Sequence, residues 1–184
     1  MNTVILISGK SNSGKGTVAN LIMNNISDNY NKIQSSLSTY IRDILKNDFF
    51  CDNMNTDTAR EFMGEVYRLG TKIYPYHMAR RVWERDNKPF LNKNKDNILV
   101  IESFRELNNY IYFKELLNKK EIDKIITIRV ERPNFNILKD ENRVKHISEV
   151  DLDNFDFNYY IYNNNGINEL NKKIIDLLNS IKLI

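Results

Sequence analysis

The sequence contains very little cysteine, histidine, glycine and proline. Cys51 is the only cysteine, and the two histidines, His77 and His146, lie far apart in the sequence. A lone cysteine excludes an internal disulfide, which suits a reducing compartment. Neither histidine has a partner at the spacing of a metal site, so we do not expect zinc. The 6 glycines and 3 prolines form no long linker, and no internal repeat is present.

The sequence also lacks a hydrophobic run of transmembrane length and a strong excess of one charge. Strand-like residues begin at Val4, and no signal-peptide pattern precedes or follows them. A net charge of +3 is too small to indicate binding to nucleic acid or to a membrane. We therefore expect a soluble cytoplasmic protein (in the host-cell cytoplasm if it is viral) with neither of these partners.

The remaining composition is that of an ordinary globular protein. Hydrophobic residues make up 41% of the chain and charged residues 28%. Such a balance argues against disorder, and 184 residues fit one domain with a sizeable core. We predict a single domain, residues 1–184.

One stretch carries most of the functional information, Gly9-Lys10-Ser11-Asn12-Ser13-Gly14-Lys15-Gly16-Thr17. It follows an apolar run at 4–7 and precedes a helical pattern of apolar residues at 18–26. Strand, glycine loop and helix together are the context of a phosphate-binding P-loop. Inward-pointing N–H groups and the positive helix end bind phosphate, and Lys15 adds charge at the outer phosphates. The pattern therefore predicts binding of a nucleoside triphosphate.

The end of this loop departs from the commonest form, because Gly16 follows the lysine and the hydroxyl comes one place later, at Thr17. The Gly-Lys-Gly-Thr ending resembles the adenylate kinase group. It leaves open whether Thr17 contacts magnesium, contacts a phosphate or begins the helix.

Strand patterns alternate with helical patterns along the chain. We expect strands at 4–8, 32–36, 98–101, 125–130 and 155–162. Alternation of this kind predicts a three-layer α/β/α P-loop NTPase fold with a parallel sheet of about five strands. Ser/Thr-x-x-Glu patterns at 58–61 and 103–106 predict two helix starts by capping boxes.

Two segments interrupt the alternation, a helical stretch at 37–90 and a basic stretch at 132–148. Both follow the carboxyl end of a strand, the edge where open α/β sheets bind ligands. Small P-loop kinases place their acceptor-binding insert and their lid in these two positions. Exposed apolar residues in the 62–83 helices would also permit a homodimer.

Phosphoryl transfer depends on positive charge around the migrating group. Arg105 follows the strand at 98–101, and Arg42 and Arg60 lie near the starts of the two insert helices. Arg132 and Arg143 bracket the predicted lid. These five arginines are candidates for holding phosphates, and a solvated helix face is the alternative for each.

A carboxylate that organises magnesium is expected near the end of the strand beside the P-loop. Glu102 stands there, and a solvent-facing strand end is its alternative. Trp83, with Tyr74 and Tyr76, fits either a surface on which a base stacks or core packing.

Short motifs occur along nearly the whole chain in a consistent order. They are Ser8-Gly9, Ser13-Gly14-Lys15-Gly16-Thr17, Leu37, Ile41-Arg42-Asp43, Arg60, Met63, Leu69-Gly70-Thr71, Trp83, Arg105, Arg132-Pro133, His146-Ile147-Ser148-Glu149, Asn164-Asn165-Gly166 and Glu169-Leu170. In order and spacing they resemble the phage-type deoxynucleoside monophosphate kinases, within the P-loop nucleoside monophosphate kinase superfamily.

The resemblance implies transfer of a phosphate from ATP to a (deoxy)nucleoside monophosphate, with Mg²⁺. It implies an ATP-binding loop of Gly9, Ser11, Asn12, Ser13, Gly14, Lys15, Gly16 and Thr17. The implied catalytic residues are Lys15, Arg105, Arg132 and Arg143. The implied substrate-binding residues are Ser36, Leu37, Arg42, Arg60, Trp83, Glu102 and Arg105. Thr17 and Glu102 would hold the metal, directly or through water.

Two departures from the family pattern leave alternatives open. Aligning Arg105 with the family's Asp-x-Arg places Ser103 at the aspartate, with Glu102 one residue earlier, and adjacent strand residues face opposite sides. The segment between Asp43 and Arg60 is also shorter than the family leads us to expect. The alternatives are a kinase of another small phosphorylated acceptor, such as phosphomevalonate, and a non-catalytic ATP-binding regulatory or nucleic-acid-associated protein.

Overall fold

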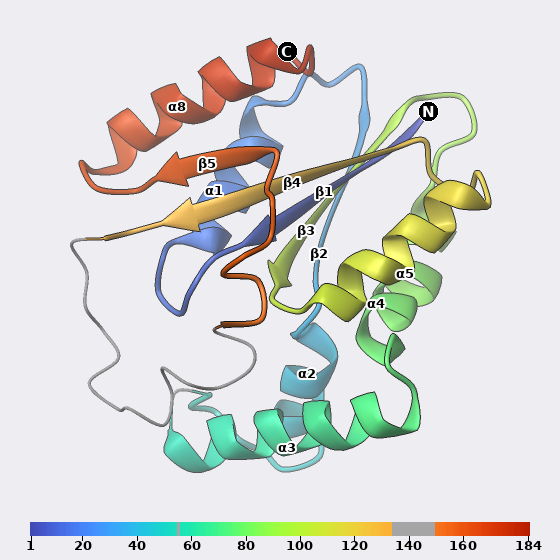
Figure 1. Cartoon of the computed structure of the whole chain (residues 1–184), viewed down its shortest axis with the longest axis vertical. Helices are drawn as coiled ribbons and strands as arrows, with labels where there is room; N and C mark the ends of the chain where they lie inside the picture. Colours follow the sequence, from blue (N-terminus) through green and yellow to red (C-terminus); the bar gives the residue numbers. More distant parts are fainter. Residues whose placement is uncertain (55, 134–149) are drawn as a thin grey trace.

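The computed structural model describes residues 1–54, 56–133 and 150–184. Its centre is one parallel sheet of five strands in the order β2-β3-β1-β4-β5 (Figure 1). The strands are β1 (Asn2–Ser8), β2 (Asn31–Ser36), β3 (Asn97–Phe104), β4 (Lys124–Glu131) and β5 (Tyr159–Tyr162). The prediction of a parallel sheet of about five strands is confirmed.

Helices cover both faces of the sheet, which explains why its central strands carry apolar residues on both faces. Ile5 and Ile7 of β1 pack in the same cluster as side chains of α1 (Lys15–Asn25) and α8 (Ile167–Ser180). Val4 and Leu6 point the other way, into the cluster that contains α5 (Leu107–Asn118). The result is the predicted three-layer α/β/α arrangement.

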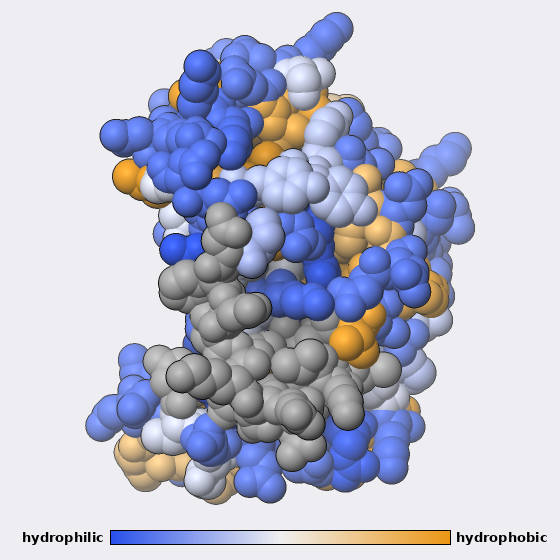
Figure 2. Space-filling model, turned by 60° about the vertical axis from the view of Figure 1, so that its left-hand side comes forward, coloured by the Kyte–Doolittle hydropathy of each residue, from blue (hydrophilic) through white to orange (hydrophobic). Residues whose placement is uncertain are grey.

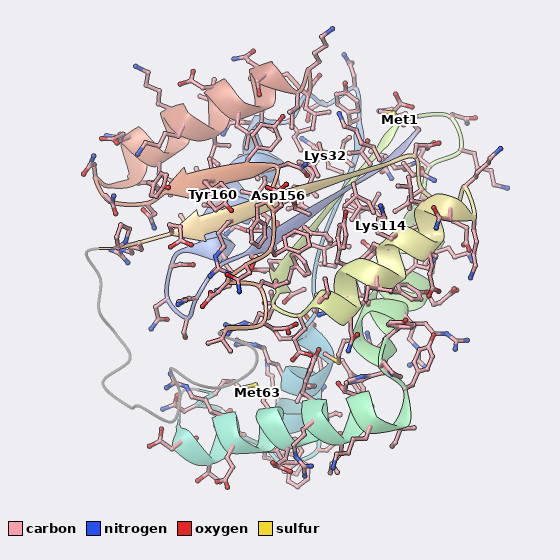
Figure 3. The ribbon with its side chains drawn as sticks, in the orientation of Figure 1. Met1, Lys32, Met63, Lys114, Asp156 and Tyr160 are labelled. Atoms are coloured by element: carbon pink, nitrogen blue, oxygen red, sulfur yellow. The ribbon has the colours of Figure 1, made fainter. Side chains whose placement is uncertain are left out.

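The segment between β2 and β3 forms the predicted helical insert. It contains α2 (Thr39–Asn47), α3 (Asp57–Ile73), α4 (His77–Arg81), a π-helix η1 (Val82–Asn87) and a 3₁₀ turn η2 (Lys88–Phe90). The elements α2 and α3 lie beyond the carboxyl ends of the strands (Figure 1). Met63 lies on the side of α3 that faces the sheet, where it packs against the core (Figure 3).

The insert is tied to the sheet through a buried asparagine. Asn87 donates from Nδ2 to the carbonyl oxygen of Val82 at 2.8 Å and to Ser35 Oγ on β2 at 3.2 Å. On the other side, the Arg81 guanidinium lies 4.6 Å from the ring centre of Tyr40 on α2. These contacts fix the insert relative to the end of β2.

Both predicted capping boxes are wrong, for different reasons. Helix α3 begins two residues earlier than the box at 58–61, because Thr56 Oγ1 accepts from the Ala59 N–H at 3.2 Å. At the second position β3 continues through Phe104, and α5 begins only at Leu107. Its first N–H donates to Asp151 Oδ2 at 2.7 Å, so the capping carboxylate comes from a distant segment.

The last predicted strand starts too early. Strand β5 begins at Tyr159, because the residues from 155 form an aromatic cluster beforehand, with Phe155 and Phe157 ring centres 4.7 Å apart. Helix α8 ends at Ser180. Most of the predicted lid, residues 134–148 with Arg143 among them, lies outside the described residues. Within the described ranges, every helix is too short or too polar to span a bilayer.

Candidate functional site

The P-loop connects the carboxyl end of β1 to the start of α1 and requires glycine at two positions. Gly9 has φ +151° and Gly14, which caps α1, has φ +97°. A Cβ on Gly9 would lie 2.5 Å from the carbonyl oxygen of Val130, which no side chain tolerates. The backbone can therefore curl tightly enough to aim successive N–H groups at one point, as phosphate binding needs.

The charged side chain of the loop is folded into it. Lys15 is only 8% exposed, and its Nζ donates to the carbonyl oxygen of Lys10 at 2.7 Å. The buried Ser13 Oγ has no hydrogen-bond partner among the residues that the structure describes. The loop thus presents an ammonium group and a hydroxyl at the concave side of the curled backbone.

A β-bulge near the end of β3 sets the position of Ser103. Leu6 pairs with Ile101, but Ser8 pairs with Phe104, so β3 holds one extra residue here. Ser103 occupies it with φ +65°, and its hydroxyl lies 3.1 Å from Ser36 Oγ and 3.4 Å from Ser38 Oγ.

Glu102 precedes the bulge and lies on the face of β3 that carries α1. Val100, two residues earlier on the same strand, packs in the cluster with α1. A Cβ on Gly16 would lie 3.2 Å from Glu102 Oε2. Glu102 therefore places its carboxylate next to the P-loop, whereas Ser103 belongs to a group of serine hydroxyls at the end of β2.

The oxygen donors at this position fit magnesium. Glu102 supplies a carboxylate next to Gly16, and the exposed Thr17 supplies a hydroxyl from the first turn of α1. No group of three or more His, Cys, Asp or Glu side chains that could hold a metal exists in the ranges 1–54, 56–133 and 150–184. Magnesium needs only one or two carboxylates when phosphates and water complete its shell. A cage of protein ligands is therefore not required here.

Sequence reasoning missed a group of charged residues beside the loop. Arg129, near the end of β4, is 6% exposed and donates to Glu131 Oε1 at 2.9 Å, Ser8 Oγ at 3.2 Å and Asp153 Oδ1 at 3.0 Å. Lys10 of the loop lies 3.5 Å from Asp153 Oδ2. One signal was available, since an arginine stands among the mostly apolar residues of this strand.

Asn163 also holds the loop and carries no sequence signal. It follows β5, and its Nδ2 donates to the carbonyl oxygen of Ser13 at 3.0 Å. A Cβ on Gly14 would lie 2.4 Å from the same nitrogen, so the side chain closes over the second glycine. The P-loop is therefore supported by β4, β5 and the segment before β5 as well as by its own helix.

A small pocket of about 180 Å³ opens beside the loop. Its lining consists of Lys10, Ser11, Asn12, Ser13, Val130, Glu131, Arg132 and Pro133. The pocket brings the predicted lid residue Arg132 to the P-loop. On the face shown in Figure 2, hydrophilic side chains predominate and hydrophobic ones form small separate patches.

The predicted acceptor residues lie on different elements at and beyond the carboxyl ends of the strands (Figure 1). Ser36 ends β2 in register with Glu102, and the buried Leu37 follows, its N–H donating to the Glu102 carbonyl oxygen at 3.1 Å. Arg105 follows β3 and is half-buried. Arg42 is exposed on α2, and Arg60 is half-buried in the first turn of α3.

Trp83 lies apart from this group. It is 1% exposed, and its Nε1 donates to Glu121 Oε2 at 3.4 Å, just before the start of β4. That position is at the amino ends of the strands, opposite the P-loop. A ring with so little exposed surface cannot stack on a base, so core packing describes Trp83.

One further ionisable group lies next to Arg105. Glu106 is buried, and its Oε1 has no hydrogen-bond partner among the described residues. Burial raises the pKa of its carboxyl above the usual range, and the charge of Asp151 acts in the same direction. Burial likewise raises the pKa of Tyr67 on α3, with the Glu106 charge adding to the effect. Glu106 and Tyr67 thus join α5 to the insert by a buried polar contact.

No protein-family model and no curated protein matches the sequence. Among solved structures, the thymidylate kinase of Ehrlichia chaffeensis is 18% identical, with 96% of this chain and 98% of that chain covered and a TM-score of 0.54. The APS kinase of Mycobacterium tuberculosis is 14% identical, with 97% of each chain covered and a TM-score of 0.46. A sugar kinase from a Janibacter species is 11% identical, with 100% and 95% covered and a TM-score of 0.45.

At such low identity, the likeness to the thymidylate kinase shows a shared fold. The chain has the P-loop NTPase-type α/β fold that the alternation of strands and helices predicts. The resemblance to the phage-type family rests on the motifs and stays a prediction.

Proposed function

We propose that the protein transfers the γ-phosphate of ATP to a (deoxy)nucleoside monophosphate and produces the nucleoside diphosphate. The observation that carries the proposal is the placing of Glu102 against Gly16, beside the buried Lys15. A phosphate loop, a lysine and a carboxylate at one strand end are the parts that phosphoryl transfer from ATP uses.

The donor side would act through charge and position. Loop N–H groups would hold the ATP phosphates, and Lys15 would exchange its bond to the Lys10 carbonyl for the outer phosphates. Thr17 and Glu102 would hold Mg²⁺, which would supply positive charge that offsets the charge of the phosphates. Arg132, in the pocket beside the loop, would add charge from the start of the lid.

The acceptor side would orient a second phosphate. An oxygen of the acceptor phosphate attacks the γ-phosphorus, the bond to the β–γ bridging oxygen breaks, and ADP leaves. Arg42 of α2, Arg60 of α3 and Arg105, which follows β3, would hold the acceptor phosphate in line, with Arg143 of the lid assisting. Ser36 and Leu37 would line the acceptor's entry beside Glu102.

A coupled assay of ADP formation tests this proposal and its alternatives together. The purified chain is given Mg²⁺ and ATP with a panel of ribonucleoside monophosphates, deoxynucleoside monophosphates and phosphomevalonate, each against a sample without acceptor. We expect ADP formation that depends on at least one nucleotide. Turnover with phosphomevalonate alone would favour the other small-acceptor kinase, and ATP binding without any acceptor-dependent ADP would favour a non-catalytic protein.

A further inference from the structure

The segment 150–158, which precedes β5, contacts both sides of the candidate site. Asp151 accepts from the first N–H of α5 at 2.7 Å, next to Arg105 and Glu106. Two residues later, Asp153 binds Arg129 at 3.0 Å and lies 3.5 Å from the ammonium of Lys10 in the P-loop. This segment therefore links the helix beside the acceptor residues to the phosphate loop.

Arg129 is the fixed point of the arrangement. Its side chain is 8% exposed, and each of its three nitrogens has a different partner: Glu131 for Nε, Ser8 for Nη1 and Asp153 for Nη2. The guanidinium also lies 5.6 Å from the ring centre of Phe157 in the same segment. Ser8 directly precedes Gly9, the first residue of the P-loop. Arg129 therefore connects Asp153 to the end of β1 from which the loop starts.

The second oxygen of Asp153 reaches the loop itself. The Lys10–Asp153 pair is exposed and long, so alone it would contribute little. It gains importance because Asp153 is held by the buried Arg129, and because the carbonyl of Lys10 accepts from Lys15 Nζ at 2.7 Å. The contacts thus run from Arg129 through Asp153 and Lys10 to the lysine of the P-loop.

We propose that Asp153 and Arg129 are positioning residues that keep the P-loop in the curled conformation that phosphate requires. They hold its first residues at Ser8 and Lys10, and neither needs to touch the nucleotide. The proposal rests on ATP being the ligand of the loop, as under the proposed function.

The direction in which ATP affinity changes when the Asp153 charge is removed distinguishes a positioning role from simple charge repulsion. A carboxylate near a triphosphate repels it, so removal of the Asp153 charge would tighten ATP binding if repulsion were its only role. A positioning role predicts weaker binding, because Lys10 and a buried guanidinium lose their partner.

The test measures the dissociation constant of Mg-ATP by calorimetry, without acceptor, for wild type and Asp153→Asn. We expect Asp153→Asn to raise it about tenfold, the loss of one charge-assisted hydrogen bond. The control is Asp156→Asn, which removes the same charge from the same segment (Figure 3), where Asp156 has no hydrogen bond or ion pair to another described residue. We expect the control to stay within about twofold of wild type.

A second variant and a second readout keep the test decisive. Arg129→Lys retains the charge, but one ammonium cannot reach three separate partners, so it is expected to weaken ATP binding as well. In the free protein, amide hydrogen exchange of residues 9–14 should accelerate in Asp153→Asn and Arg129→Lys and remain unchanged in Asp156→Asn. Asp153→Glu, which keeps the carboxylate, should recover part of the lost affinity.

Each outcome bears on a distinct claim. If wild type does not bind Mg-ATP, the proposed function fails, and this inference fails with it. If wild type binds ATP and Asp153→Asn binds it equally well or more tightly, with unchanged exchange in the loop, the proposed function stands and the positioning role is refuted. If Asp153→Asn does not fold, the same two measurements on Arg129→Lys decide.

Discussion

The donor and acceptor sides of the candidate site are built differently. The donor side is one continuous stretch of nine residues, 9–17, whose shape is set by backbone and glycine and which three other segments support. The proposed acceptor side takes Arg42 from α2, Arg60 from α3 and Arg105 from the segment after β3. The difference teaches that the shape of the loop is fixed by local geometry, whereas the proposed acceptor side depends on how the insert packs on the sheet.

The largest expected effect is on the donor side. Lys15→Ala should leave a folded protein whose turnover is lower by roughly a thousandfold, because the loop would lose its charge on the migrating phosphate. Lys114→Ala, on the exposed surface of α5 (Figure 3), is the matched control and should leave turnover unchanged. The coupled assay measures the turnover of both variants. Near-normal turnover of Lys15→Ala would contradict the proposed mechanism.

The carboxylate at the strand end gives the next largest effect. Glu102→Gln should lower turnover on the order of a hundredfold, because the amide keeps the size of the side chain but loses the charge that holds magnesium. Ser103→Ala should change turnover less than about threefold, since among the described residues its hydroxyl contacts only Ser36 and Ser38. Raising Mg²⁺ should partly restore Glu102→Gln. A larger loss in Ser103→Ala than in Glu102→Gln would contradict the assignment of the magnesium-holding role to Glu102.

An acceptor-side change should separate the two halves kinetically. Arg105→Ala should lower kcat/KM for the nucleotide acceptor about thirtyfold by removing a charge-assisted contact, with the KM for ATP within about twofold of wild type. The matched comparison is Arg85→Ala, an exposed arginine on η1 away from the P-loop edge. If Arg105→Ala raised the KM for ATP as strongly as it affected the acceptor, the division into two sides would not hold.

The smallest expected effect is on stability and depends on pH. The folded pKa of Glu106 is raised above its ordinary 4.5, so the folded chain binds its proton more tightly than the unfolded chain. Its contribution to stability is therefore present below pH 4.5 and is lost as the pH rises through the folded pKa.

Glu106→Gln, which cannot ionise, should thus be more stable than wild type at pH 7 and nearly equal at pH 4. Urea unfolding at both pH values measures this. Glu61→Gln, exposed on α3, is the control and should change stability by less than about 0.5 kcal/mol at either pH. Equal stability of Glu106→Gln and wild type at pH 7 would show that ionisation of Glu106 does not destabilise the folded protein.

The sequence predicted the parts of the fold that depend on local pattern. Continuous apolar runs identified β1 and β3, and the glycine loop between β1 and α1 was found from its residues alone. The prediction of the cap of α5 was wrong because the capping residue, Asp151, lies 44 residues away from Leu107 in the sequence. No local pattern can reveal such a contact.

The site was predictable to a similar degree. The P-loop residues needed no structure, but the choice between Glu102 and Ser103 did, because only the packing of Val100 shows which face of β3 carries α1. The sequence did not predict the residues that contact the P-loop from other strands and segments, Arg129, Asp153 and Asn163. These contacts join residues that are far apart in the sequence. Trp83, which the family motif places with the substrate, packs in the core at the opposite edge.

The most direct test of the central claim follows the phosphate itself. The wild-type chain is incubated with Mg²⁺, ATP labelled in the γ-phosphate and the best nucleoside monophosphate of the panel, and the products are separated. The account predicts that the label appears in the β-phosphate of the nucleoside diphosphate and that Lys15→Ala abolishes this product. Label that stays in ATP, or that appears only in inorganic phosphate, would contradict it.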